Sequence, residues 1–150
     1  MTPREQEIQR RIELSETRIT KAVFPFTTNH HNTLFGGTAL GWMDEISFIT
    51  ATRFCRLPTV TVSSDRVDFK HPIPGGSIVE LIGRVVQVGN TSCKVEVEIF
   101  VEGMYCGTRE KAITGVFSFV AIDENKRPRA ILPDFSSEKG RSGLSGCSPM

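Results

Sequence analysis

Residues able to do chemistry lie close together in one stretch of the sequence. Asn29 supplies an amide, Gly36 and Gly37 form a glycine pair, and Asp44 supplies a carboxylate. A glycine pair lets the backbone approach a ligand and leaves N–H groups free at the start of a helix, where a developing oxyanion is stabilised. With an amide to hold a water or carbonyl and a carboxylate to take a proton, the set indicates hydrolysis of an activated acyl group. No Ser-His-Asp elbow, G-x-S-x-G or P-loop motif competes with it.

The longest helix expected from the sequence follows the glycine pair, within the stretch 29–54. Its apolar residues recur at three- and four-residue steps and also cover much of the remaining circumference, which predicts a helix buried inside the protein. These residues are Ala39, Leu40, Trp42, Met43, Ile46, Phe48, Ile49 and Ala51.

Two adjacent carboxylates on this helix face different surroundings. Asp44 lies on the side of Leu40 and Phe48, whereas Glu45 lies on a more polar stripe. A lone carboxylate moved off water needs a partner, a bound water or a raised pKa, so Asp44 is a candidate catalytic acid. The alternative is that both acids complement the positive end of the helix dipole in its first two turns.

Composition limits the class of protein. The 150 residues, 39% hydrophobic and 23% charged, predict one globular domain. A net charge of +1 and the absence of a basic run interleaved with aromatics argue against nucleic acid and anionic membrane surfaces as partners. No apolar run approaches membrane-spanning length, and the N-terminus lacks a signal-peptide core.

The cysteines indicate reduced thiols and therefore a cytoplasmic location. They are widely spaced, without a CxxC pair or a histidine at ligand spacing, so neither a zinc site nor a disulfide framework is expected. We expect no metal and no redox cofactor. The four positions are Cys55, Cys93, Cys106 and Cys147.

The rest of the chain is expected to form strands around the helix. Thr2, Pro3 and Glu5 form a helix-start pattern, which predicts a short peripheral helix over residues 3–14. Alternating apolar residues and turn signals such as HPIPGG predict five strands. These cover residues 17–26, 59–69 with a phase break at 64–68, 78–88, 91–101 and 105–122.

This order predicts an α+β fold in which an antiparallel meander wraps around one central helix, because the connections are too short for helical crossovers. We expect an N-terminal lead over residues 1–16, the main domain over 17–133 and a mobile Ser/Gly-rich tail over 134–150. One sheet covers only one flank of a helix that is apolar nearly all round. The other flank and the strand edges therefore predict at least a dimer.

Several motifs together resemble the cytosolic acyl-CoA hydrolase family of hot-dog-fold thioesterases. They are N-x-x-x-x-x-F-G-G, W-M-D-E, VTVSSDRVDFKHPIPGGS and VGNTS, and the resemblance covers roughly residues 17–131. The resemblance implies a hot-dog fold, an acyl-CoA substrate and active sites at the interface of a dimer, usually assembled into a trimer of dimers.

The resemblance also implies roles for the residues that match these motifs. Asp44 matches the catalytic acid, which acts as a general base on water or attacks the thioester directly. Asn29 matches an active-site amide that comes from the subunit opposite the one supplying Asp44. Gly37 matches the residue whose backbone N–H polarises the thioester carbonyl. One departure is Asn32, where members of the family commonly have glycine; asparagine tolerates the left-handed backbone that the loop needs.

A turn later in the chain matches the segment with which the family contacts CoA. Its backbone N–H groups and hydroxyls could hold pantetheine or phosphate oxygens, although an ordinary hairpin turn fits the same residues. The turn consists of Gly89, Asn90, Thr91 and Ser92. Basic candidates for the CoA phosphates are Arg84, Lys126, Arg127 and Arg129, with simple solvation as the alternative.

The remaining aromatic and histidine residues favour structural roles. Adjacent His30 and His31 cannot easily point at one metal, so loop or interface packing is expected. We assign Phe35, Gly36 and Phe48 to substrate binding. The two phenylalanines are expected either to make core or dimer contacts or to line an acyl tunnel.

Two other functions remain open at this point. One is a hot-dog hydratase or dehydratase, which needs a histidine paired with an acid in its pocket; His71 is the candidate, but it lies far along the chain from Asp44. The other is a non-catalytic acyl-CoA sensor, which binds CoA esters without releasing thiol.

Overall fold

The computed structural model describes residues 1–135. Most of the predicted tail, residues 136–150, lies outside the described residues. At the start of that tail, Pro133–Phe135 forms a short 3-10 turn.

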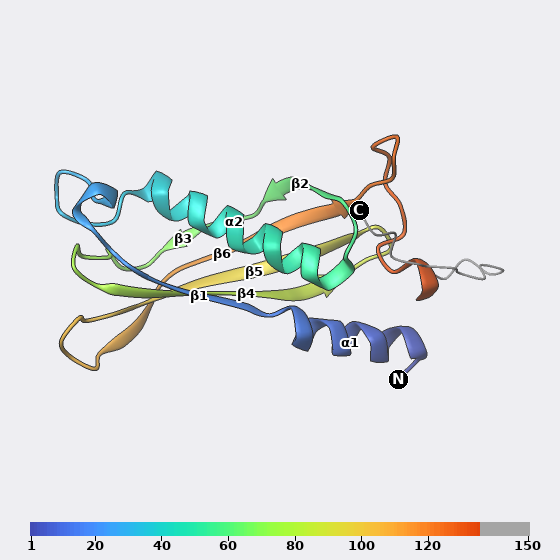
Figure 1. Cartoon of the computed structure of the whole chain (residues 1–150), viewed down its shortest axis with the longest axis horizontal. Helices are drawn as coiled ribbons and strands as arrows, with labels where there is room; N and C mark the ends of the chain where they lie inside the picture. Colours follow the sequence, from blue (N-terminus) through green and yellow to red (C-terminus); the bar gives the residue numbers. More distant parts are fainter. Residues whose placement is uncertain (136–150) are drawn as a thin grey trace.

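One long helix, α2 (Gly36–Cys55), lies across one face of the sheet (Figure 1). It begins after Phe35, which provides no side-chain cap, and it ends where Arg56 adopts a left-handed conformation with φ 56°. The residues that face the sheet include Ala39, Met43 and Ile46, each at most 1% exposed. The three- and four-residue spacing of these side chains therefore directs one flank of α2 into the core.

The sheet is antiparallel throughout and has the strand order β1-β4-β5-β6-β2, with the short β3 pairing with β6 (Figure 1). Alternate side chains of the central strands are buried against α2, as expected for a sheet that is covered on one face. The strands are β1 (Thr17–Ala22), β2 (Thr59–Ser64), β3 (Asp68–Phe69), β4 (Ile78–Val88), β5 (Ser92–Glu102) and β6 (Arg109–Ala121).

The N-terminal helix α1 (Pro3–Ser15) packs beside the C-terminal end of α2 and against β4. Its cap is the predicted one, because Thr2 Oγ1 accepts a hydrogen bond of 3.1 Å from the N–H of Glu5. Ile8 and Ile12 pack against the core. The predicted peripheral helix therefore exists and covers one end of the sheet.

Three expectations about the fold need correction. The first strand ends at Ala22 rather than Phe26, because the chain turns into a 3-10 helix at Pro25–Thr27. The last strand begins at Arg109, after an irregular hairpin tip. The meander is confined to β4, β5 and β6, since β2 pairs with β6 at the sheet edge. By contrast, one flank of α2 is exposed in the single chain, as expected for a helix that a single sheet covers on one side.

Candidate active site

The first two residues of α2 offer unused backbone donors. The N–H groups of Thr38 and Ala39 both donate to the carbonyl of Phe35, at 3.0 Å. Within the described residues, no backbone hydrogen bond uses the N–H groups of Gly36 and Gly37, and α2 has no acidic residue in its first turn. The positive end of the helix dipole and two free amides therefore remain available to an anionic oxygen.

Asp44 lies on the flank of α2 that is exposed in the single chain, where a second copy would have to cover it. Leu40 and Phe48, one turn away on either side, are 40% and 48% exposed. Among the described residues, no side chain pairs with the Asp44 carboxylate. Because Asp44 is the ninth residue of α2, well beyond the first turn, the alternative that it complements the helix dipole is disfavoured.

The carboxylate is thus an unpaired charge on an exposed strip that also carries the apolar side chains of Leu40 and Phe48. We call this exposed strip the α2 flank; its members are Gly37, Leu40, Gly41, Asp44, Glu45 and Phe48.

Asn29 organises the loop that precedes α2. Its side-chain oxygen Oδ1 accepts hydrogen bonds from the N–H of His31 at 2.8 Å and from the N–H and Oγ1 of Thr33 at 3.2 and 3.1 Å. No contact within residues 1–135 engages the Nδ2 donors of this half-buried amide. Asn29 therefore keeps its N–H donors available while its oxygen holds the loop.

Asn32 takes the left-handed conformation that the sequence predicted, with φ 60°. Its carbonyl accepts a hydrogen bond of 2.9 Å from the N–H of Gly75, and a Cβ at position 75 would lie 2.5 Å from Asn32 Oδ1. The loop therefore closes tightly against the HPIPGG turn even though asparagine replaces the family's glycine.

Two hollows lie along α2, one towards each end. The first, about 240 Å³, lies near the helix N-terminus, and Leu34, Ala39 and Phe69 contribute to its wall. The second, about 460 Å³, lies near the C-terminal end between Phe48 and Thr59. Both are mainly apolar. Phe48 thus faces a hollow, whereas Phe35 is 55% exposed and its ring lies over Gly37.

Sequence reasoning assigned no role to the hydroxyl groups of β2. Thr61 is opposite Phe119 in the register, and Phe119 is fully buried against α2, so Thr61 lies on the α2 side of the sheet. Strand β2 is an edge strand, and Val60 and Val62 on it are 42% and 55% exposed. The alternation of threonine and valine along β2 was the signal that could have revealed this open edge.

The predicted CoA turn lies at the other end of the molecule. Gly89–Ser92 joins β4 to β5 beside the C-terminal end of α2, whereas Gly36 and Gly37 lie where β4 begins (Figure 1). Within one chain, the structure does not bring this turn to the helix N-terminus. It does bring the turn to the basic segment after β6, because Ile131 N–H donates to Asn90 O at 2.9 Å. Lys126, Arg127 and Arg129 lie in that segment.

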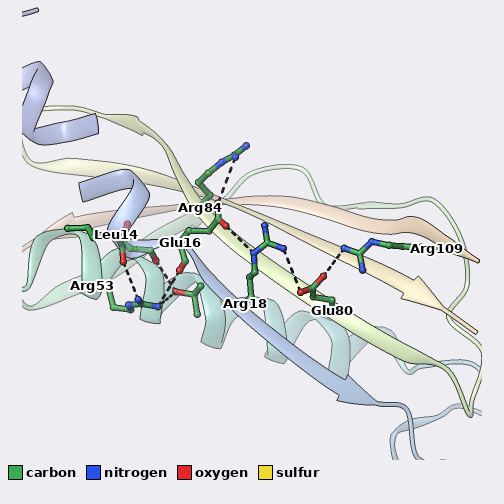
Figure 2. A network of polar contacts seen from close by, with 9 residues as sticks. Leu14, Glu16, Arg18, Arg53, Glu80, Arg84 and Arg109 are labelled. Atoms are coloured by element: carbon green, nitrogen blue, oxygen red, sulfur yellow. Dashed lines mark hydrogen bonds and ion pairs between the residues drawn. The ribbon is translucent and has the colours of Figure 1, made fainter. Parts of the chain in front are cut away.

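Arg84 is placed away from these groups. It lies on the face of β4 opposite α2, within a network of ion pairs and hydrogen bonds (Figure 2), and its guanidinium is 3.9 Å from Glu16. A neighbouring branch of the network joins Arg18 and Arg109 through Glu80. Arg84 is thus engaged by an acid on the outer face of the sheet.

The histidines and cysteines do not assemble a metal site in the described part of the chain, where no three potential ligands converge. The rings of His30 and His31 pack against each other with centroids 3.8 Å apart. Cys55, Cys93 and Cys106 are free, and Cys147 lies outside the described residues. Burial raises the pKa of the Cys55 thiol and raises that of Cys93 to about 12, so both are unreactive thiols.

An antiparallel sheet wrapped around a single helix, with an uncapped helix N-terminus and a carboxylate on its open flank, defines the α+β hot-dog class. The Thioesterase superfamily matches residues 31–108, more than half of the chain. The chain belongs to this superfamily, in the family of hot-dog-fold acyl-CoA thioesterases.

Known proteins resemble the chain over most of its length. The Bacillus subtilis protein named "uncharacterized acyl-CoA thioester hydrolase YkhA" is 46% identical over 109 residues, which are 73% of this chain and 63% of that protein. The chain thus matches less than two thirds of that relative's length.

Two solved structures share the fold. A Staphylococcus aureus acyl-CoA hydrolase, in complex with butyryl coenzyme A, coenzyme A and coenzyme A disulfide, has a TM-score of 0.76 and 35% identity, covering 79% of this chain and 73% of that one. An apo-hexameric acyl-CoA thioesterase has a TM-score of 0.77 and 37% identity, covering 79% of this chain and 76% of that one.

No helix in residues 1–135 is long and apolar enough to cross a membrane.

Proposed function

We propose that the protein hydrolyses acyl-CoA thioesters to free CoA and a carboxylic acid. The observation that carries the proposal is the unpaired Asp44 carboxylate on the α2 flank, on the same helix as the unused N–H groups of Gly36 and Gly37. A carboxylate that takes a proton and amides that receive an oxyanion are the two groups that thioester hydrolysis needs. Family membership supports the same reaction.

In the proposed mechanism, Asp44 removes a proton from a water molecule as its oxygen attacks the thioester carbonyl. The carbonyl oxygen becomes an oxyanion, which the N–H of Gly37 stabilises at the start of α2. The C–S bond then breaks, and the CoA thiolate leaves and takes up the proton. Direct attack by Asp44 is the alternative: it would form a mixed anhydride and release the CoA thiolate, and water would then hydrolyse the anhydride. Detection of ¹⁸O in the aspartate after a single turnover in ¹⁸O-water would establish direct attack, because a water activated by Asp44 transfers its oxygen only to the product.

A second copy of the chain completes the proposed site. The α2 flank and the open edge at Val60 and Val62 supply an apolar surface that a partner copy would cover, lowering the polarity around Asp44. By comparison, the other edge strand, β1, carries Arg18 and Lys21, which discourage pairing. We infer a homo-oligomer built from dimers, with Asn29 supplied from the opposite subunit. The hexameric relative is consistent with a trimer of dimers.

We propose that the CoA moiety lies along Gly89–Ser92 and the basic residues after β6. Because this turn and the start of α2 lie at opposite ends of one chain, the CoA contacts and the catalytic groups would come from different subunits. Arg84 is a weaker candidate, since Glu16 already engages it. No metal or redox cofactor enters the proposed reaction.

Replacement of Asp44 by asparagine tests the function, with Glu45→Gln as the matched control. The two carboxylates are adjacent and both exposed, so each change removes one charge from α2. We expect Asp44→Asn to lower kcat for acyl-CoA at least tenfold, about 1.4 kcal/mol of barrier, and Glu45→Gln to change it less than threefold. A smaller loss in Asp44→Asn excludes Asp44 as the base. A thiol reagent and a panel of acyl chain lengths provide the readout.

The two rival functions have separate tests. His71 Nε2 lies 4.0 Å from Glu110 Oε2, and the side chains are 51% and 61% exposed, so they form no oriented acid–base pair for hydration. Absence of enoyl-CoA hydration in a spectrophotometric assay excludes the hydratase. An acyl-CoA sensor would bind CoA esters in a calorimeter without releasing thiol.

The division into an N-terminal lead (1–16), a thioesterase domain (17–133) and a tail (134–150) remains a proposal. A cytoplasmic location is likewise proposed; the free thiols favour it, and a mouse relative with 26% identity is named a cytosolic acyl coenzyme A thioester hydrolase.

A further inference from the structure

A basic hollow of about 250 Å³ lies between α1 and the C-terminal end of α2. Four of its seven lining residues are arginines, and no acidic residue lines it. We call it the arginine hollow; its lining residues are Arg10, Arg11, Leu14, Arg53, Phe54, Cys55 and Arg56.

Two of these arginines are held in fixed positions. Arg53 donates to Leu14 O at 3.1 Å, to Glu16 O at 3.3 Å and to Thr17 Oγ1 at 3.1 Å, as Figure 2 shows around the end of α1. Arg11 donates to Phe54 O at 3.3 Å and to Glu7 at 2.6 Å, and its side chain is only 24% exposed. Guanidinium groups that the fold already orders lose little freedom when they bind a ligand.

The positive charge in the arginine hollow is incompletely balanced. One oxygen of Glu7 pairs with both Arg10 and Arg11, at 3.1 and 2.6 Å. Among the described residues, no carboxylate pairs with Arg53 or Arg56. Four guanidinium charges against one carboxylate leave an excess of three, in a chain whose net charge is only +1.

We propose that the arginine hollow binds the diphosphate group of a phosphorylated ligand. Guanidinium groups match phosphate oxygens in bidentate geometry, and a multiply charged anion would neutralise the excess. The hollow has room for a diphosphate and too little for a whole CoA molecule. The arginine hollow shares no lining residue with the α2 flank or with the turn Gly89–Ser92, so the proposal stands whether or not the proposed hydrolysis is correct.

The competing explanation is that the arginines only stabilise the C-terminal end of α2. Arg11 does donate to Phe54 O, and cations favour the negative end of a helix dipole. Arg56, however, makes no side-chain hydrogen bond within the described residues, and Arg10 contacts only Glu7 there. These two residues can therefore be changed to test anion binding without removing the bonds that join α1 to α2.

The test uses inorganic pyrophosphate and calorimetry at low salt, where charge interactions are least screened. We expect wild-type protein to bind pyrophosphate and Arg10→Gln/Arg56→Gln to bind it at least tenfold more weakly. The control is Arg66→Gln/Lys94→Gln, which removes the same charge outside the hollow and should change the affinity less than twofold. Melting temperatures of both variants verify folding.

Failure of wild-type protein to bind pyrophosphate overturns the proposal, as does an equal loss in the two double variants. ADP and acyl-CoA then distinguish the source of the diphosphate. If a free nucleotide is the ligand, ADP binding falls in Arg10→Gln/Arg56→Gln while the KM for acyl-CoA is unchanged. If the CoA diphosphate is the ligand, that KM rises at least tenfold while kcat is preserved.

Discussion

The side-chain oxygen of Asn29 accepts two hydrogen bonds from Thr33, one from its N–H and one from its hydroxyl. A residue proposed for catalysis thus also shapes the loop that leads into α2. The two roles use different atoms, because Oδ1 holds the loop while Nδ2 stays available for a substrate or a water. This separation lets a substitution test one role without the other.

Asn29→Asp should abolish activity and preserve the loop. Aspartate keeps an oxygen acceptor for Thr33 but has no N–H donor, so we expect kcat to fall at least tenfold with little change in melting temperature. Asn29→Ala also removes the acceptor and should cost about 1–3 kcal/mol of unfolding free energy. His30→Gln, a neighbouring exposed change, is the control. Full activity in Asn29→Asp would exclude the amide from the reaction.

Gly37→Ala should impair catalysis without weakening α2. A Cβ at this position would lie 2.6 Å from Cε2 of Phe35, so the ring or the first turn of α2 must shift, next to the Gly37 N–H that is proposed to receive the oxyanion. We expect a tenfold or greater loss in kcat/KM. Gly41→Ala, where a Cβ meets nothing within 4 Å, serves as the stability control. Each change should gain up to about 1 kcal/mol of helix propensity in urea unfolding; a large loss in Gly37→Ala alone would indicate a packing role.

Val62→Glu should break the proposed oligomer. Val62 is 55% exposed on the edge strand β2, and a charge there opposes burial by a second copy. Light scattering should show a smaller species with lost activity. Val86→Glu is the matched control. Val86 is similarly exposed, at 46%, but it lies on β4, which has a neighbouring strand on each side, rather than on an edge strand. An unchanged mass for Val62→Glu would place the subunit interface elsewhere.

Gly83→Ala should destabilise the packing of α2 on the sheet. A Cβ at this position would lie 2.6 Å from Thr50 Oγ1, which is fixed by a hydrogen bond of 2.7 Å to Ile46 O. Overpacking at a rigid contact costs about 1–3 kcal/mol, measurable by urea unfolding. Gly107→Ala, where a Cβ meets nothing within 4 Å, should change stability little. An equal change in unfolding free energy for Gly83→Ala and Gly107→Ala would show that Thr50 moves to accommodate the added Cβ.

Stability should fall at alkaline pH because of Cys93. Burial, with a smaller contribution from the charge of the nearby Cys55 thiolate, raises the pKa of its thiol from 9.0 to about 12. Between these values the unfolded chain loses the proton while the folded chain retains it. The unfolding free energy therefore falls as pH rises, by at most about 1.4 kcal/mol per pH unit. Cys93→Ala should make the unfolding free energy less dependent on pH in this range. An unchanged pH dependence would show that other titrating groups cause it.

Local patterns predicted most of the fold. The Thr2 cap, the glycine pair that begins α2 and the alternation along β5 each determine an element through contacts within a few residues. The pairing of β2 with β6 was not predicted, because it joins segments separated by three other strands and depends on the twist of the whole sheet.

The candidate site was predicted in its residue types but not in its surroundings. Asp44, Asn29 and Gly37 could be chosen as candidates because chemistry restricts the residue type, and their roles stay predictions. The exposure of Asp44 could not be predicted. The sequence of a helix that is apolar nearly all round does not show whether its second flank packs against the same chain or against another chain. The location of Thr61 on the α2 side of the open sheet edge was not predicted, for a related reason. The position of a hydroxyl on an edge strand depends on the order of strands in the sheet rather than on its neighbours in sequence.

The sheet order also affects how the chain can fold during synthesis. Strand β1 cannot pair until β4 has been synthesised. Strand β2 has no partner in the sheet until β6, the last strand, has left the ribosome. Until then β2 and one edge of β5 remain unpaired, and such exposed strand edges favour aggregation or chaperone binding. Translation of residues 109–121 is thus the point at which the nascent chain can first close its core.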